Sequence, residues 1–237
     1  SNSANGPSAL YSNTSGSSNV ATGRASLYYN TTGDLNVAYG TYTLFYNTTG
    51  IRNVAMGAGA GSYVFGNQNV LIGWQAGIGS STASTTYNSA VAVGYQALAR
   101  NISGTGNVAI GLESMFSNTT GANNAATGLY SLYSNTMGNS NTAVGSRALY
   151  YNTGGNENSA DGWQALYSNT IGINNTANGS SALFSNTTGN NNTASGRSSL
   201  NKNTVGSNNT VDGSNGLFDL GAAQSATALI AGQIYTI

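Results

Sequence analysis

Few side chains in this sequence are suited to acid–base or metal chemistry. The 237 residues include no His and no Cys, which excludes zinc fingers, iron–sulfur sites, Ser-His-Asp or Cys nucleophile systems and disulfide frameworks. Six carboxylates remain: Asp34, Glu113, Glu157, Asp161, Asp212 and Asp219. They are spread along the sequence, and no motif brings two of them together. We therefore expect no enzymatic activity, no catalytic residues, no metal site and no cofactor.

Motifs for binding anions or membranes are also missing. The segment Gly57-Ala58-Gly59-Ala60-Gly61 resembles a phosphate loop only superficially, because no Gly-Lys-Ser/Thr ending and no helical pattern follow it. Six Lys and Arg residues cannot form a surface that neutralises phosphates, so nucleic acid is not an expected partner. No apolar run approaches the roughly 18 residues of a membrane span, and residues 1–6 lack the features of a signal peptide. We expect neither membrane insertion nor a secretion signal.

The sequence is organised by a repeat, Asn-x-Ala-x-Gly, that recurs every 17 residues nearly throughout. Counting the first Asn of each repeat as position 0, thirteen copies cover residues 1–218. Two spacings differ: 16 residues separate Asn53 from Asn69, and 21 separate Asn69 from Ala90. The irregular region is 53–106, and residues 219–237 leave the repeat, so we expect them to be a linker or the start of another module.

Each repeat position has a restricted residue type. Position 4 is Gly in all thirteen copies, position 2 is Ala in eleven, and position 8 is Leu or Met in eleven. Position 9 is usually aromatic, and an Asn-Thr-x-Gly segment follows it. Gly and Asn are turn residues, and helix is disfavoured by the density of Gly, Asn and Thr. Two turns in 17 residues predict two short strands per coil.

One coil of this length cannot fold alone, because its few apolar side chains do not offset the conformational entropy of ordering it. Stacked coils form hydrogen bonds to one another and align like residues into columns, with Ala and Leu inside and Asn at the corners. The sequence therefore predicts an all-β parallel β-solenoid or β-roll of about thirteen 17-residue coils. The aromatic residues of position 9 are expected to pack on one another, although stacking on sugar rings is an alternative.

The outward face of the predicted strand, at positions 1 and 3, is apolar in the first half of the chain. Its residue pairs are Val37/Tyr39, Val54/Met56, Val70/Ile72, Val91/Val93 and Val108/Ile110. An apolar stripe of this extent is typical of an association site, which predicts a homotrimer packed around a shared axis. After residue 140 the same positions are mostly polar, as in Thr176 and Asn178. That half either faces solvent or forms a hydrated interface between chains.

Two sequence features resemble known repeat families. The string Gly106-Asn107-Val108-Ala109-Ile110-Gly111 resembles the repeat of YadA-type heads in trimeric autotransporter adhesins, which are trimeric β-rolls. The fuller unit, residues 141–153, is similar to tandem repeats in bacteriophage tail-fibre proteins. The 17-residue period is longer than is typical of the adhesin heads, and the sequence has neither a heptad stalk nor a membrane-anchor barrel. These departures favour the phage fibre.

The irregular region contains the best candidate for a binding site. An insertion follows Gly79, and insertions in solenoids form loops that often carry recognition. The candidate receptor-contact residues are Ser81, Thr82, Ser84, Thr85, Thr86 and Tyr87. A tolerated bulge without a ligand is an equally good interpretation. The Asn-Thr-Thr triplets match the glycosylation sequon, but because they recur with the turn we expect a structural role.

Together these features predict a structural segment of a phage tail fibre, a stiff extracellular spacer on a virion that contributes to host attachment. The expected partners are two further copies of the chain, other fibre or virion proteins, and a host surface glycan. The alternative is the head of a bacterial trimeric adhesin that binds host glycans or matrix at the cell surface. An ice-binding solenoid is a remote alternative, because the adjacent Thr residues Thr48 and Thr49 would point to opposite faces.

Overall fold

The computed structural model describes residues 1–216, in two compact units of which the first spans residues 1–123 and the second begins at Asn124. The last two residues of the predicted repeat region, and the predicted further module at 219–237, lie outside the described residues. Within residues 1–216 the secondary structure consists of short strands, without any helix that is long and apolar enough to cross a membrane.

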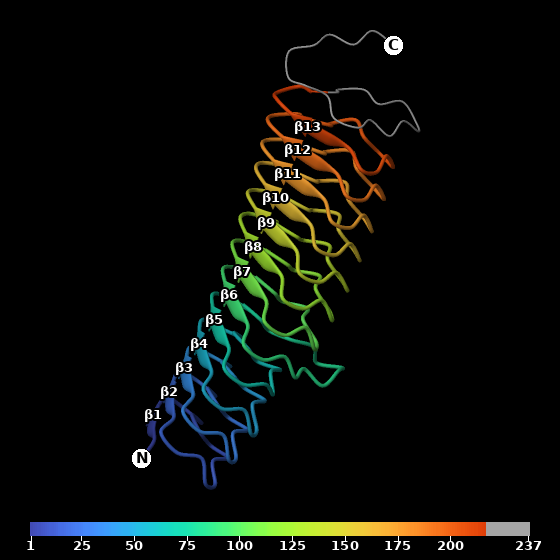
Figure 1. Ribbon diagram of the computed structural model, residues 1–237. Coiled ribbons are helices and arrows are strands. Elements are labelled where there is room, and N and C mark those ends of the chain that lie inside the picture. The colour runs from blue at the N-terminus through green and yellow to red at the C-terminus, as the bar shows by residue number, and fades with distance from the viewer. Residues whose placement is uncertain (217–237) are drawn as a thin grey trace. The chain divides into compact units, whose positions relative to one another are not determined.

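The first unit is a parallel β-solenoid with one strand per coil (Figure 1). Its strands are β1 (Ser3–Asn5), β2 (Val20–Thr22), β3 (Val37–Tyr39), β4 (Val54–Met56), β5 (Val70–Ile72), β6 (Val91–Val93) and β7 (Val108–Ile110). Each strand pairs in parallel with the next one along the chain, and Ala38 lies opposite both Ala21 and Ala55. The register therefore aligns equivalent repeat positions, even across the irregular spacings.

The second unit has the same architecture. Its strands are β8 (Ala125–Thr127), β9 (Thr142–Val144), β10 (Ser159–Asp161), β11 (Thr176–Asn178), β12 (Thr193–Ser195) and β13 (Thr210–Asp212). They pair in parallel with a register of one repeat. The predicted fold class, an all-β parallel β-solenoid built from 17-residue coils, is confirmed in both units.

The interior of each unit is a set of columns of small and branched apolar residues. Leu132, Leu149 and Leu166 are fully buried at position 8 of three consecutive coils. The backbone N–H of Leu149 donates to the carbonyl of Ala165 in the next coil at 3.0 Å, and Leu132 forms the equivalent bond at 2.9 Å. Position 8 is therefore buried in the regular coils that have a neighbour on each side, as a stacked solenoid requires.

Two columns of buried Asn run along the corners of the coils. At position 0, the backbone N–H of Asn158 donates to Oδ1 of Asn141 at 3.0 Å, and its Nδ2 donates to the carbonyl of Gly172 at 2.8 Å. At position 11, Nδ2 of Asn169 donates to Oδ1 of Asn152 at 2.8 Å. The Asn residues of the Asn-Thr-Thr triplets belong to this second column and are buried: Asn30, Asn47, Asn118 and Asn186. The structural role expected for these triplets is confirmed.

The prediction of two strands per coil was wrong. On the side of the coil that carries the Leu, residues at positions 6 and 8 have left-handed backbone, with φ of 56° at Tyr42 and 48° at Leu44. Adjacent positions 7 and 8 are both buried, as Ala148 and Leu149 show. A strand would point adjacent side chains to opposite faces, so this segment curls instead and brings both residues inside.

The invariant Gly of position 4 is explained by the contact between coils. Gly40 has φ of 137°, a conformation that other residues rarely adopt. A Cβ atom at Gly40 would lie 2.8 Å from the carbonyl carbon of Gly57 in the next coil. A side chain at this position would therefore force the coils apart, which accounts for Gly in every copy.

Candidate functional site

The coil at residues 53–68 departs from the repeat at three neighbouring positions. Gly61 replaces the buried Leu of position 8, Ser62 replaces the aromatic residue of position 9, and Val64 replaces the Asn of position 11. All three are buried and lie in the first unit. This coil therefore interrupts an interior column, a surface column and an Asn column at once.

The lost interior volume is supplied by two larger residues from other positions. Leu71 stands where most coils have the Ala of position 2, and a Cβ atom added at Gly61 would lie 2.7 Å from its Cδ1. Gly77, the next position 8, faces Leu71 and the ring hydroxyl of Tyr87. Tyr87 is fully buried, and its hydroxyl donates to the carbonyl of Gly77 at 2.6 Å. Burial raises the pKa of Tyr87 far above its ordinary range, so the phenol stays protonated.

On the outside of the first unit, two columns of aromatic rings run side by side. Tyr11, Tyr28 and Phe45 stack at position 9 with ring centroids 5.1 and 5.3 Å apart. Tyr29, Tyr46 and Tyr63 stack at position 10 with centroids 5.2 and 5.0 Å apart. The first column ends at Phe45 because Ser62 follows it, whereas the second continues for one more coil. The expected aromatic column is confirmed, and the second unit repeats it from Tyr133 to Phe184.

In the second unit, the stacked column also changes the ionisation of its phenols. Burial is the largest cause that raises the pKa of Tyr150, followed by the neighbouring phenol of Tyr133. Burial likewise raises the pKa of Tyr167, which is further raised by a hydrogen bond with Tyr151. All three effects oppose the phenolate, so Tyr150 and Tyr167 keep their protons to higher pH than a phenol in water.

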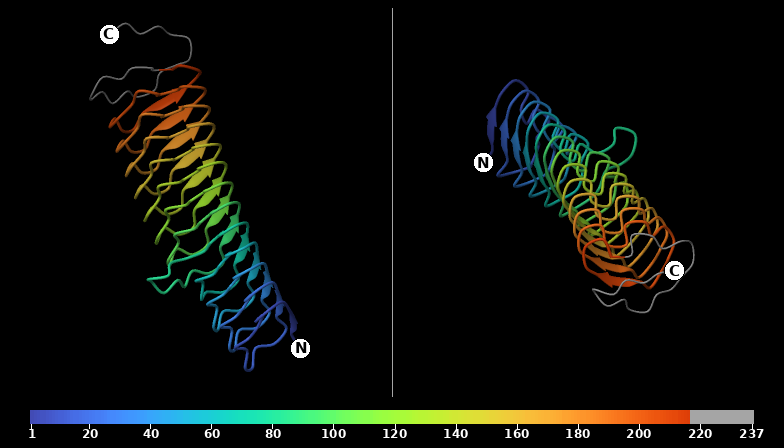
Figure 2. Two further views of the ribbon diagram at one scale, coloured as in Figure 1. Left: turned by 180° about the vertical axis from the view of Figure 1, so that it is seen from behind. Right: turned by 90° about the horizontal axis from the view of Figure 1, so that it is seen from above.

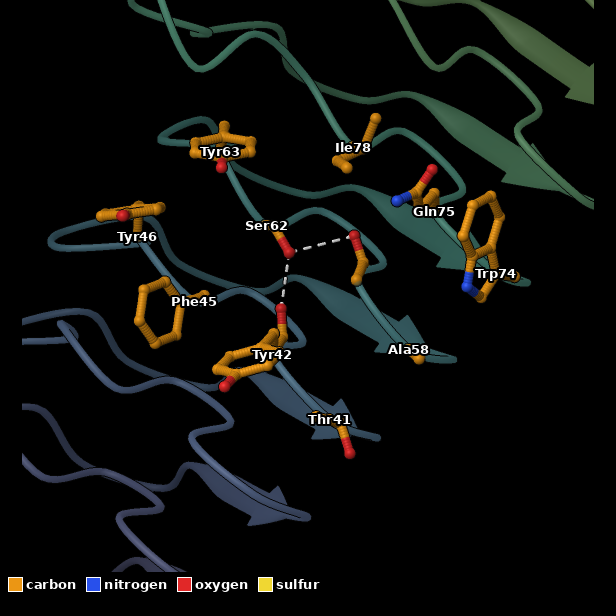
Figure 3. A pocket seen from close by; sticks show the side chains of 11 residues that line it. Thr41, Tyr42, Phe45, Tyr46, Ala58, Ser62, Tyr63, Trp74, Gln75 and Ile78 are labelled. Carbon is orange, nitrogen blue, oxygen red and sulfur yellow. Dashed lines mark hydrogen bonds between the residues drawn. The ribbon is translucent and has the colours of Figure 1, made fainter.

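A hollow of about 410 Å³ lies where the first column ends (Figure 3). It is lined by Thr41, Tyr42, Phe45, Tyr46, Ala58, Gly59, Ser62, Tyr63, Trp74, Gln75 and Ile78. The hydroxyl of Ser62 lies in the middle of this set, 2.6 Å from the carbonyl of Tyr42 and 3.1 Å from that of Gly59. The lining combines aromatic rings with neutral hydrogen-bonding groups and contains no charged side chain.

A second hollow, of about 480 Å³, adjoins the first and shares Tyr46 and Tyr63 with it. Its other side is formed by Phe65 and by the insertion loop, residues 80–84. The loop projects from the coils of the first unit and is the green excursion in Figure 2. The insertion therefore forms one wall of a surface depression, next to the interrupted aromatic column.

The structure separates the six candidate receptor-contact residues into two groups. Ser81, Thr82, Ser84 and Thr86 are exposed, whereas Thr85 and Tyr87 are fully buried. Thr85 forms a parallel bridge with Val64, and Tyr87 fills the interior space left by Gly77, so neither side chain can touch a receptor. Their part in the candidate contact is corrected: the insertion returns to the solenoid at Thr85 and places Tyr87 in the core.

The five carboxylates within residues 1–216 are dispersed, and Asp219 lies outside the described residues. Asp34 has a structural contact, since its Oδ1 accepts a hydrogen bond from the backbone N–H of Ser17 at 2.6 Å. Asp161 and Asp212 share a register position on β10 and β13, but two strands lie between them, which places them about 14 Å apart. Over residues 1–216, no three His, Cys, Asp or Glu side chains come together where a metal ion could bind.

The fold places this chain in the class of parallel β-solenoids. A comparison with models of known protein families, with curated proteins and with solved structures finds no significant match. The candidate site therefore rests on the geometry of the chain itself. Sequence reasoning did not identify Tyr46, Tyr63, Trp74 or Gln75 as site residues. The available signal was Ser62, a small residue that directly follows three aromatic residues at position 9.

Proposed function

We propose that this chain is a structural segment of an extracellular fibre of the bacteriophage tail-fibre class, and that it assembles as a homotrimer through the strand face of its first unit. The observation that supports the proposal is the apolar character of that face. On β3 to β7 both outward positions carry apolar or aromatic residues in every strand. Tyr39 is 56% exposed and Met56 is 44% exposed in the single chain.

Assembly through this face would remove from water the apolar surface that a single chain exposes. Contiguous exposed apolar surface favours association, because removing it from water contributes about 25 cal/mol per Å². The register is position for position, so the exposed side chains form straight rows that a second copy can match. Three copies, rather than two, are proposed because the repeat resembles trimeric fibre and adhesin repeats.

The rest of the structure is consistent with a spacer. The interior of each unit is given to Ala, Leu and Asn columns, and each coil bonds to its neighbours through backbone and Asn side chains. Such columns leave few backbone groups exposed to proteases, and they depend little on charge, since only 5% of residues are charged. Coils bonded in this way suit an environment outside the cell.

Sedimentation equilibrium of the full chain tests the assembly on which the fibre function depends. The expected mass is three times the chain mass of 23.9 kDa. The variant Met56→Asp/Ile110→Asp places charges on the strand face and is expected to sediment as a monomer with the same circular dichroism spectrum. Leu35→Asp is the matched control, because Leu35 is 50% exposed but lies off the strand face. A monomeric parent chain, or dissociation in the control alone, would contradict the proposal.

A further inference from the structure

We propose that the hollow beside Phe45 is a carbohydrate-binding subsite that takes one uncharged pyranose ring. The proposal is independent of the trimer, because none of the residues that line the hollow belongs to a strand of the first unit. It rests on three features: a missing ring in the aromatic column, neutral hydrogen-bonding groups around the gap, and a second hollow that continues toward the insertion loop.

The missing ring defines the shape of the ligand. Rings in the position 9 column are spaced by 5.1 and 5.3 Å, and Ser62 occupies the place where the next ring would stand. Ile78 follows at the same position in the next coil and forms the far side of the hollow. The gap between Phe45 and Ile78 thus has room for one flat ring, held at the stacking distance that the column already uses.

The groups around the gap match the chemistry of a sugar. A pyranose has C–H faces that pack on aromatic rings and an edge of hydroxyls that need donors and acceptors. Phe45 and the rings of Tyr46 and Tyr63 supply apolar surface, as Figure 3 shows. The single hydroxyl proton of Ser62 is directed at the carbonyl of Tyr42, with that of Gly59 also within reach, so the oxygen is left to accept a hydrogen bond from the ligand.

Gln75 supplies oriented donors. Its Oε1 accepts a hydrogen bond from Nε2 of Gln96 at 2.8 Å, which fixes the plane of the amide. In Figure 3 the amide nitrogen of Gln75 points toward the hollow, where its two N–H groups can reach a ligand hydroxyl. No lining residue is charged, and the nearby guanidinium of Arg24 packs over the ring of Tyr42, 5.6 Å from its centroid. The lining therefore supplies no ion pair for an acidic or phosphorylated sugar, and the uncharged ring is the ligand that it fits.

The second hollow sets the direction of a longer glycan. It shares Tyr46 and Tyr63 with the first, and the exposed hydroxyls of Ser81 and Thr82 lie on its far wall. A sugar linked to the ring beside Phe45 would therefore pass over the two Tyr side chains toward the insertion loop. This gives the loop a contact role that Ser81, Thr82 and Ser84, the exposed candidate residues on this wall, can fulfil.

The test is saturation-transfer NMR and calorimetry of the full chain with the methyl glycosides of glucose, galactose and N-acetylglucosamine and with neutral oligosaccharides that contain them. We expect at least one glycoside to bind, with an affinity that does not change with sodium chloride, since no ion pair contributes. Oligosaccharides should bind more tightly than the monosaccharide they contain. Failure of every neutral glycoside to bind, or binding of acidic sugars alone, would overturn the proposal.

Two variants locate the binding. Ser62→Tyr restores a ring to the column and is expected to abolish binding without lowering the melting temperature, because the preceding coil carries Phe45 at this position and the new ring can stack on it. Asn201→Tyr is the matched control: it places the same residue at the same repeat position in the second unit, and binding should be unchanged. Binding that survives Ser62→Tyr contradicts the assigned site.

Gln75→Ala provides a readout that does not depend on filling the hollow. Ala25 has the same left-handed backbone at this repeat position, with φ of 52° against 51° at Gln75, so the substitution should fold normally. Loss of the amide donors is expected to weaken binding by about tenfold.

A further probe is p-cresol, which mimics a Tyr side chain. If p-cresol binds the parent chain but not the Ser62→Tyr variant, and no glycoside binds, then the occupant is an aromatic residue of a protein and the proposal fails.

Discussion

The side-chain oxygen Oδ1 of Asn47 is buried without a hydrogen-bond partner because Val64 stands at the equivalent position of the next coil. In a regular coil the next Asn donates to this oxygen, as Asn186 does to Asn169 at 2.9 Å. The two buried Asn residues have the same kinds of donor contact but differ at the acceptor: Oδ1 of Asn169 is satisfied, and Oδ1 of Asn47 is not. An unsatisfied buried acceptor costs about 1–3 kcal/mol.

This difference predicts unequal effects of the same substitution. Both Asn47→Ala and Asn169→Ala remove an Nδ2 that donates to a Gly carbonyl at 3.1 Å and to the preceding Asn. Asn169→Ala also removes the Oδ1 that accepts a hydrogen bond from Asn186, whereas Asn47→Ala removes an Oδ1 that has no donor. We expect Asn169→Ala to lower the free energy of unfolding by about 1–2 kcal/mol more than Asn47→Ala. Urea unfolding followed by circular dichroism measures both values, and equal losses would contradict the interpretation.

The exchange of volume between Gly61 and Leu71 predicts a coupled pair. Gly61 has φ of 60°, close to the 48° of Leu44, so its backbone already accepts a Leu. Gly61→Leu alone should lower the free energy of unfolding by about 1–3 kcal/mol, because the new side chain collides with Leu71. Leu71→Ala alone leaves a cavity and should cost about 2–5 kcal/mol.

The double variant Gly61→Leu/Leu71→Ala restores the residue types of a regular coil. We expect its loss in free energy of unfolding to be smaller than the sum of the single losses by about 1–3 kcal/mol. A double-mutant cycle from urea unfolding gives the coupling energy directly. Additive losses would show that Leu71 does not occupy the space of the absent Leu.

Much of the fold could be predicted from the sequence because stacking turns each repeat position into a line of neighbours. Gly at position 4 and Ala at position 2 recur because each meets its own kind in the next coil, as Gly40 meets Gly57. The aromatic column follows from the same logic. In such a fold the repeat spacing determines which residues are neighbours, and the 17-residue spacing can be recognised in the sequence.

The parts that could not be predicted depend on contacts between unlike positions. Nothing in a Leu residue favours left-handed backbone, yet Leu44 adopts it because burial and bonds to the neighbouring coil outweigh the local cost. Tyr87 looked like a loop residue because it follows an insertion, but the insertion returns early and the ring fills an interior gap. The hollow beside Phe45 arises because Ser62 has no ring. The absence of a ring is not a signal when a sequence is searched for reactive or charged residues.

The buried phenol of Tyr87 predicts a specific loss of stability in alkali. Burial raises its pKa in the folded protein, while the unfolded chain titrates near the ordinary value of about 10. Below pH 10 both states hold the proton, and the free energy of unfolding does not depend on this group. As the pH rises above about 10, only the unfolded state releases the proton, so this group lowers the free energy of unfolding by up to about 1.4 kcal/mol per pH unit.

The variant Tyr87→Phe separates the hydrogen bond from the titration. At pH 7 it loses the bond to the carbonyl of Gly77 and should be less stable than the parent by about 1 kcal/mol. Above pH 10 the parent releases about one more proton on unfolding than Tyr87→Phe does, so its free energy of unfolding falls more steeply with pH. The difference in stability between parent and variant therefore shrinks as the pH rises. Tyr11→Phe serves as the control, because it removes a side chain that is 70% exposed and leaves the buried phenol of Tyr87 in place. Urea unfolding between pH 7 and pH 11 measures the slopes; a parallel course for parent and Tyr87→Phe would mean that this phenol ionises equally well in both states, contrary to its burial.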